Sequence, residues 1–147
     1  MEVVNREAKY NYFILEEIEC GIVLTGTEIK AIRDSKINLK DSYAVIRRGE
    51  VFLINSHISE YKEGNIFNHH PTRTRKLLLH KREIEKLNSK INQEGLTLIP
   101  LKLYFKKNKV KILLGVCKGK KTFDKREAIK ERDLKREANK LQKYNYK

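Results

Sequence analysis

Alternating apolar and polar positions run through most of the chain and predict strands. Residues 10–24 are rich in aromatic and β-branched side chains, interrupted by glutamates, which favours one bent strand or two short strands. Gly21 within this run suits a bulge or a close approach of a neighbouring backbone. Residues 42–55 and 96–116 each alternate on both sides of a short turn, and Gly49 supplies the positive φ that the first turn needs. The pattern therefore predicts two hairpins besides the first strand region.

Two other stretches change to the helical period. Thr25 and Glu28 have the spacing of a capping box, so a short helix is expected to begin there. Residues 80–94 carry apolar side chains at helical spacing, and Gly95 stands where such a helix would end. Residues 56–75 have little periodicity and predict a long exposed loop, of a length that is usually functional or disordered.

These elements predict a mainly β domain with flanking helices, whose hairpins close into a small antiparallel barrel without exposed edges. We place this domain at residues 1–117. Residues 118–147 contain twelve Lys/Arg and five Asp/Glu, a net charge of +7, which is half of the +14 of the chain. Their apolar stripe is too thin to dock on a core, so we expect a basic C-terminal tail, disordered when free and helical when bound.

The charge of the chain narrows the choice of partners. With 33 Lys+Arg against 19 Asp+Glu, the positive potential attracts polyanions: nucleic acid, anionic membrane or acidic protein. Nucleotide bias that enriches lysine is the alternative explanation of the high charge.

No apolar run reaches the roughly 18 residues of a membrane helix and no secretory signal is apparent, so a cytoplasmic protein without membrane contact is expected. Cys20 and Cys117 lack metal or redox spacing and are expected to be reduced core thiols.

One basic cluster lies in the middle of the chain. Residues 72–76 and 80–82 combine Arg and Lys with hydroxyl groups that can also donate to phosphate. Tyr61, Phe67 and His69 lie nearby in the sequence and are suited to stacking on unpaired bases. RNA contact is the interpretation that we favour, and a solvated loop and helix start is the alternative.

A second cluster begins the tail, at residues 119–121 and 124–126. A glycine beside paired lysines permits close approach to a phosphate backbone, and the segment is not a Walker A loop, which needs a different spacing. A solubilising tail is the alternative interpretation.

Signals for catalysis are poor. No nucleophile motif or metal-ligand spacing is present, so no enzyme, no metal and no cofactor are expected. Two alternatives to the favoured RNA-binding function remain: a structural RNA-binding protein of ribosomal type, and a metal-dependent nuclease that uses Glu19.

Several longer segments resemble a known family. They are NREA (5–8), GIVLTGTEIKAIR (21–33), NLKDSYAVIRRGEVFLIN (38–55), NIFNHHPTRTRKLLLHKREI (65–84), EGLTLIPLKLYFKKNKVKI (94–112) and GVCKGKKTFDKR (115–126). The string PTRTRKLLLHKRE and the pattern GxxKGKKxxDKR are very specific. On these residues the chain resembles the SsrA-binding protein family, also called small protein B, over nearly its whole length.

The resemblance implies a fold and a function. It implies an OB-fold-like antiparallel β-barrel that binds the tRNA-like domain of transfer-messenger RNA (tmRNA, or SsrA RNA) and delivers it to stalled 70S ribosomes for trans-translation. The C-terminal tail would occupy the empty decoding centre and the mRNA channel. Elongation factor Tu and alanyl-tRNA synthetase would be partners through charged tmRNA, and the protein would act as a monomer.

The resemblance also implies site residues. By matching motif, the RNA-binding face includes Asn5, Glu19, Leu78 and Lys111. Lys76 and His80 flank Leu78 and are added from their own chemistry. The segment expected at the decoding centre comprises Gly119, Lys120, Lys121, Phe123, Asp124, Lys125 and Arg126. Leu134 and Leu141 are expected to dock the helix of the tail.

Overall fold

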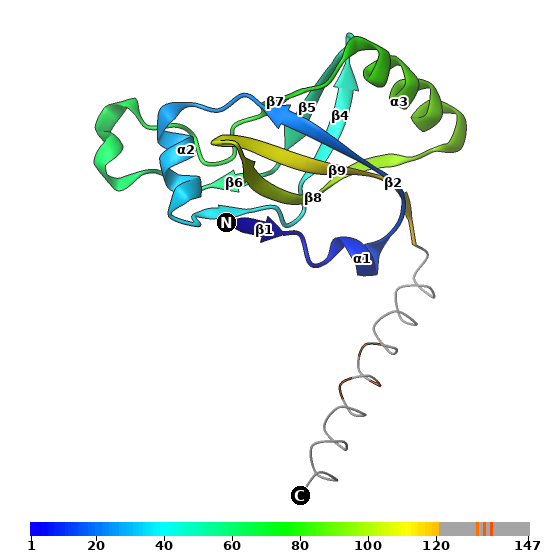
Figure 1. The fold of residues 1–147 in the computed structure, drawn as a ribbon, viewed down its shortest axis with the longest axis horizontal. Coiled ribbons are helices and arrows are strands. Elements are labelled where there is room, and N and C mark those ends of the chain that lie inside the picture. The colour runs from blue at the N-terminus through cyan, green and yellow to red at the C-terminus, as the bar shows by residue number, and fades with distance from the viewer. Residues whose placement is uncertain (121–131, 133, 135, 137–147) are drawn as a thin grey trace, which may run out of the picture.

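Seven of the strands form one antiparallel sheet that curls round on itself, and the other two pair with each other as a separate small sheet (Figure 1). A computed structural model describes residues 1–120, 132, 134 and 136 of the chain. In chain order the elements are β1 (Glu2–Val4), α1 (Ala8–Asn11), β2 (Tyr12–Ile22), α2 (Gly26–Arg33), β3 (Ile37–Asn38), β4 (Tyr43–Arg47), β5 (Glu50–Ile54), β6 (His57–Ile58), the 3-10 helix η1 (Lys62–Phe67), β7 (Arg75–Leu78), α3 (Lys81–Glu94), β8 (Thr97–Lys106) and β9 (Lys109–Gly119).

The sheet closes into a ring. Its order is β1-β8-β4-β5-β7-β2-β9, and β8 also pairs with β9, so six strands close on themselves while β1 is attached outside. Closure is uneven, because β4 meets β8 through the single pair Ala44↔Leu98 and β2 meets β7 through two pairs. The ring is therefore an incompletely bonded, OB-fold-like closure rather than a regular barrel. The prediction of a mainly β antiparallel fold is confirmed.

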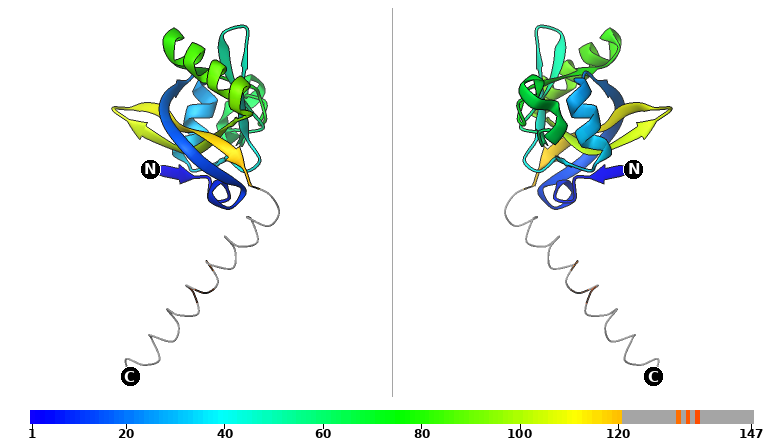
Figure 2. Two further views of the ribbon diagram at one scale, coloured as in Figure 1. Left: turned by 90° about the vertical axis from the view of Figure 1, so that its right-hand side faces the viewer. Right: turned by 90° about the vertical axis from the view of Figure 1, so that its left-hand side faces the viewer.

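The inward faces of the ring strands make the main core, which the helices α2 and α3 cover. Leu103, Ile112 and Leu114 are fully buried on β8 and β9, α2 adds Ile32, and α3 adds Leu87. Burying each such side chain stabilises the fold by about 1.5–3 kcal/mol. Figure 2 shows α3 and α1 at opposite ends of the molecule. Under α1 lies a second, smaller core of Ala8, Ile99, Leu101 and Cys117.

Both predicted hairpins are confirmed. Arg48 and Gly49 connect β4 to β5 with φ of 52° and 75°, and Lys107 and Asn108 connect β8 to β9 with φ of 51° and 64°. Two consecutive residues at positive φ match the right-handed twist of the strands that they join. The second turn sets the register between β8 and β9.

The two predicted helices are confirmed with their end signals. The Thr25 hydroxyl accepts the backbone N–H of Glu28, and the Glu28 carboxylate accepts the backbone N–H of Thr25 at 2.8 Å, which completes the capping box of α2. Gly95 ends α3 at φ 63°. The long first strand is also confirmed as β2, whose register shifts between Ile14 and Glu16.

The prediction of a long exposed loop at residues 56–75 is wrong. This segment contains β6, η1 and the first residue of β7, and three of its polar side chains are buried: Ser56, His69 and Arg75. His69 is buried, with Nδ1 2.9 Å from the Thr27 hydroxyl and Nε2 2.8 Å from the Ile58 carbonyl. His69 is therefore not available to stack on a base as predicted, because both ring nitrogens are used to hold the segment against α2 and β6.

The two cysteines are free and buried in the core, as predicted. Burial raises the pKa of Cys20 to about 12 and that of Cys117 to about 11. Both thiols therefore stay protonated at neutral pH and act as small apolar side chains.

Candidate nucleic-acid interface

A row of residues runs across the outer face of four strands. Gly21 on β2 pairs with Leu78 on β7 and with Lys111 on β9, and Lys111 pairs in turn with Tyr104 on β8. Residues that pair directly across strands project to the same face of a sheet. The pairing therefore brings the predicted RNA-binding residues Leu78 and Lys111 onto one surface, together with Glu19, which lies two residues before Gly21.

An open hollow lies within this row. Its volume is about 480 Å³, and it is lined by Glu19, Cys20, Gly21, Leu78, Leu79, His80, Glu83 and Lys111. Gly21 has no side chain, so it leaves the space between Leu78 and Lys111 unfilled. Leu78 is 51% exposed, so it offers an apolar surface at the rim of the hollow. The structure thus brings together Glu19, Leu78, His80 and Lys111.

Glu19 is held as a carboxylate by its neighbours. It accepts a hydrogen bond from the Tyr104 hydroxyl and another from Lys106 Nζ at 3.3 Å. The bond from Tyr104 is the main cause that lowers the pKa of Glu19. Burial, followed by the bond to Glu19, raises the pKa of Tyr104 to about 12. The hollow is therefore lined by a fixed negative group as well as by Lys111.

Tyr104 and Lys106 belong to this surface although sequence reasoning missed them. The alternating pattern of residues 96–116 predicts a hairpin, but it does not indicate that Tyr104 and Lys106 contact Glu19. The signal that could have found them is the hairpin register itself, because the turn at Lys107-Asn108 sets Tyr104 opposite Lys111.

Lys76 lies on β7 two residues before Leu78, on the same outward face, and its Nζ is 3.1 Å from Glu50. His80 precedes α3, where its backbone N–H donates to the Glu83 carboxylate at 2.9 Å. Lys76 therefore extends the surface beyond the hollow, while His80 lines it.

Asn5 lies elsewhere. Its side chain donates to the Pro100 carbonyl at 2.9 Å, and its backbone N–H donates to the Leu101 carbonyl at 2.8 Å. It lines a separate depression with Asn11 and Tyr43, beside α1. The structure does not bring Asn5 into the hollow, and its two hydrogen bonds hold the segment after β1 against β8.

The prediction that Arg75 contacts RNA is wrong. Arg75 is fully buried, where Nε donates to the Glu28 carboxylate at 2.6 Å and Nη1 donates to the Ser56 carbonyl at 2.9 Å. Arg73 stands at the surface side of the same carboxylate, with Nη2 2.6 Å away. Arg75 is buried because side chains alternate between the two faces of β7, which places Arg75 on the inward face with Leu77.

The buried carboxylate of Glu28 links α2 to β7. Burial alone would raise its pKa, but the hydrogen bonds from Arg73, the Thr25 N–H and Arg75 outweigh burial and lower the pKa to about 2. Burial also lowers the pKa of Arg75. Sequence reasoning assigned Glu28 only to the cap of α2. It missed the ion pair, which positions β7 and with it the Leu78 wall of the hollow.

The predicted tail residues are described only in part. Gly119 ends β9, and Lys120 follows it directly. Leu134 is 56% exposed. Lys121, Phe123, Asp124, Lys125, Arg126 and Leu141 lie outside the described residues. Within the described residues, no group of three or more potential ligands could hold a metal ion, and no helix is long and apolar enough to cross a membrane.

Comparison with known proteins decides the family. A family model described as SmpB protein matches residues 2–144. The chain belongs to the SmpB family. The resemblance found in the sequence is therefore confirmed over nearly the whole chain.

Named relatives support this membership of the SmpB family. The SsrA-binding protein of Acetivibrio thermocellus is 57% identical over 142 residues, which are 97% of this chain and 92% of the relative. That of Desulfitobacterium hafniense is 59% identical over 133 residues, which are 90% of this chain and 85% of the relative. Among solved structures, a chain described as "tmRNA-SmpB: a journey to the center of the bacterial ribosome" matches with a TM-score of 0.70 and 45% identity. The match covers 87% of this chain and 94% of that one.

Proposed function

We propose that this chain binds the tRNA-like domain of tmRNA through the hollow and delivers the RNA to stalled ribosomes for trans-translation. The observation that carries the proposal is the row of Leu78, Gly21 and Lys111 beside Glu19, in an SmpB-family chain of net charge +14. Relatives described as SsrA-binding proteins, and a solved relative described as tmRNA-SmpB, support this choice of RNA.

Each group in the hollow suits a different part of a folded RNA. The ammonium of Lys111 pairs with a phosphate, which supplies affinity through counterion release. The exposed side chain of Leu78 packs against a ribose or a base. The charged carboxylate of Glu19 accepts a hydrogen bond from a base amino group or from a 2′-hydroxyl. Recognition then rests on the shape of the RNA together with a few directed contacts.

The same electrostatics support a function by binding alone. A general acid or base near neutral pH needs a pKa close to the working pH. The pKa of Glu19 is instead lowered, chiefly by the hydrogen bond from Tyr104. Glu19 is thus suited to be a permanent hydrogen-bond acceptor, so we propose no catalytic activity and no cofactor.

The tail completes the proposal. Residues 118–147 would enter the empty decoding centre and the mRNA channel, where twelve basic residues meet ribosomal phosphates and the segment becomes helical. Charged tmRNA would bring alanyl-tRNA synthetase and elongation factor Tu as indirect partners. The working unit would be a cytoplasmic monomer.

Binding specificity tests the proposal. The full chain is titrated with the tRNA-like domain of tmRNA, an elongator tRNA and a 16S rRNA fragment at equal salt. We expect the tRNA-like domain to bind at least about tenfold more tightly, which corresponds to about 1.4 kcal/mol. Equal affinity for all three RNAs would overturn the proposal, and stable association with one ribosomal subunit in the absence of tmRNA would favour a structural protein of ribosomal type.

Truncation tests the separate role of the tail. Because β9 ends at Gly119 and Lys120 bonds to α1, deletion of residues 121–147 leaves the strand pairing intact. The truncated chain should keep its affinity for the tRNA-like domain and lose peptide tagging on stalled ribosomes. Equal loss of both would place the tail within the RNA site.

A further inference from the structure

The point at which the tail leaves the folded domain is held by three contacts to one lysine. The pairing of β2 with β9 ends at Tyr12↔Gly119, and the backbone N–H of Lys120 then donates to the Asn11 carbonyl at 3.0 Å. The side-chain ammonium of Lys120 donates to the Lys9 carbonyl at 2.9 Å. Both acceptors are carbonyls of α1 that a helix of four residues leaves without a partner within the helix.

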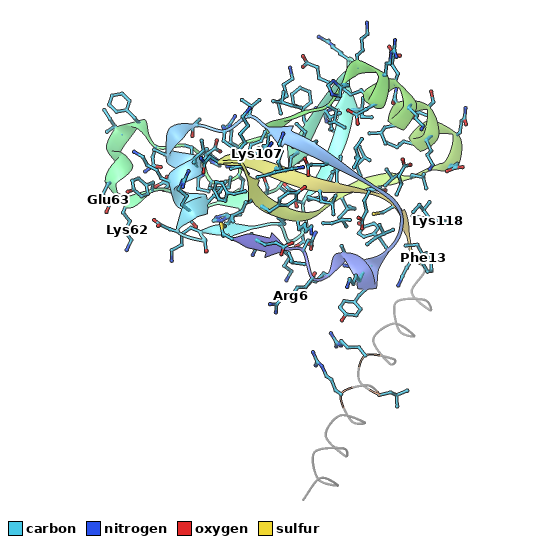
Figure 3. The ribbon with its side chains drawn as sticks, viewed as in Figure 1. Arg6, Phe13, Lys62, Glu63, Lys107 and Lys118 are labelled. Carbon is cyan, nitrogen blue, oxygen red and sulfur yellow. The ribbon has the colours of Figure 1, made fainter. Side chains whose placement is uncertain are left out.

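The third contact is aromatic. Lys120 Nζ lies 4.8 Å from the centre of the Phe13 ring, within the range of a cation–π interaction. Phe13 pairs with Lys118 across the end of the β2–β9 ladder, and Figure 3 shows both side chains at the end of the molecule where β9 finishes. The ring is 45% exposed, so packing in the core does not explain its position.

The partners of the Lys120 ammonium are electrically neutral, in contrast to those of three other surface lysines. Lys76, Lys90 and Lys106 each have a glutamate within 3.3 Å. The Lys120 ammonium contacts a carbonyl and a ring, neither of which cancels its charge. A lysine that is held in this way keeps its full attraction for phosphate while its position is fixed. A second cation beyond β9 has a similar contact, because Arg132 Cζ lies 5.0 Å from the Tyr10 ring.

We propose that Phe13 is a positioning residue for the tail. Its ring and the two α1 carbonyls hold Lys120, so that the chain leaves the folded domain in a set direction and the charge of Lys120 stays available to phosphate. This inference rests on the proposed function, because the direction of the tail matters only if the tail acts on the ribosome. On the ribosome, the Lys120 ammonium keeps the Lys9 carbonyl and the ring, and donates a further N–H to a phosphate oxygen.

A matched series at position 13 tests this inference. Phe13→Leu keeps an apolar side chain and removes the π face, whereas Phe13→Tyr keeps the π face. Since the ring is half exposed, both variants should fold, and Phe13→Ile serves as a second aliphatic variant suited to a strand. Peptide tagging on stalled ribosomes should fall about two- to fivefold in the aliphatic variants and return in Phe13→Tyr, as the loss of an exposed cation–π contact predicts. Affinity for the tRNA-like domain of tmRNA should stay unchanged in all of them.

Nuclear magnetic resonance of the free protein supplies a readout that does not depend on the ribosome. In the wild type, the ring current of Phe13 should shift the ε-methylene protons of Lys120 upfield, and the shift should disappear in Phe13→Leu. Unshifted protons in the wild type, or wild-type tagging by Phe13→Leu, would overturn the inference. A wild-type chain that shows the shift but does not bind tmRNA would overturn the proposed function and leave the contact established.

Discussion

Gly21 and Leu78 face each other across β2 and β7 so closely that a methyl group on Gly21 would lie 3.3 Å from Cβ of Leu78. At that distance Leu78 would have to give way by a few tenths of an ångström. Leu78 is half exposed, so it has room to move outward. Glycine at position 21 therefore matters mainly because it leaves the hollow open, and less because a larger side chain would clash with its neighbours.

Gly21→Ala should weaken RNA binding with little loss of stability. The added methyl fills the floor of the hollow and displaces Leu78, so we expect the Kd for the tRNA-like domain of tmRNA to rise about fivefold or more, about 1 kcal/mol. The free energy of unfolding should fall by about 1 kcal/mol or less, at the low end of overpacking costs. Titration with labelled RNA and urea denaturation measure the two effects.

Gly26→Ala is the matched control for this substitution. A methyl at Gly26 would meet no atom within 4 Å, and alanine favours the helix that begins there. RNA affinity should be unchanged in this variant. If Gly21→Ala binds as tightly as the wild type, the hollow is not the RNA site.

The salt dependence of binding should identify Lys111 as a phosphate contact. If some 6–8 phosphates are neutralised, log affinity should fall against log salt with a slope of roughly −5 to −7. Lys111→Met should make the slope shallower by about 0.9. Lys90→Met is the control, because Lys90 lies on α3 with Glu16 at 3.0 Å, away from the hollow. An unchanged slope in Lys111→Met would count against a phosphate at this position.

The buried carboxylate of Glu28 should make stability depend on acid pH. Its pKa is about 2 in the folded chain against an ordinary value of 4.5, so the folded state favours the charged form. The stabilisation is complete above pH 4.5 and is lost as the pH falls towards 2. At neutral pH, Glu28→Gln should cost about 3 kcal/mol, because Arg75 stays buried without its counter-charge. Urea denaturation should show that the difference in free energy of unfolding between wild type and Glu28→Gln shrinks as the pH falls from 4.5 towards 2.

An exposed ion pair gives the comparison for Glu28. Glu16→Gln removes the surface pair with Lys90, and such pairs contribute no more than about 1 kcal/mol. If the wild type exceeds Glu28→Gln in free energy of unfolding by the same amount from pH 6 to about pH 2, the charge of Glu28 does not stabilise the fold.

Phe67 should contribute to RNA binding and not to folding. It is 84% exposed at the end of η1, where the Asn68 side chain bonds to both the backbone N–H and the carbonyl of Tyr61. Phe67→Ala should leave the melting temperature unchanged and weaken RNA binding by about 1–3 kcal/mol, the usual contribution of one stacked base. Ile66→Ala, at an equally exposed neighbour without a ring, should have a smaller effect. Equal affinity of Phe67→Ala and wild type would exclude stacking at this position.

Local signals made the hairpins and helices predictable, whereas contacts between distant segments were not visible in the sequence. Gly49 and Gly95 fix a turn and a helix end by their own backbone freedom, so neighbouring residues suffice to find them. The pair of Glu28 with Arg75 joins positions 47 residues apart and exists only once β7 lies beside α2. Charge alone suggested an exposed Arg75, but the alternation of β7 determines which way it points.

The resemblance to a family supplied the positions of Glu19, Leu78 and Lys111, and the strand register explains why those three lie on one surface. Sequence reasoning could not supply Tyr104 as a partner of Glu19, because that bond crosses 85 residues. Nor could it separate Asn5 from the hollow, since the distance between the two surfaces follows from the place of β1 outside the ring.

The ion cluster beneath β7 restricts how this protein can be reduced or rebuilt. Grafting the row of residues on β7, β2 and β9 onto another scaffold requires α2 as well, since the carboxylate that anchors Arg75 comes from that helix. A minimal peptide mimic of this row would lack this anchor, and its leucine wall would have no fixed place from which to meet RNA.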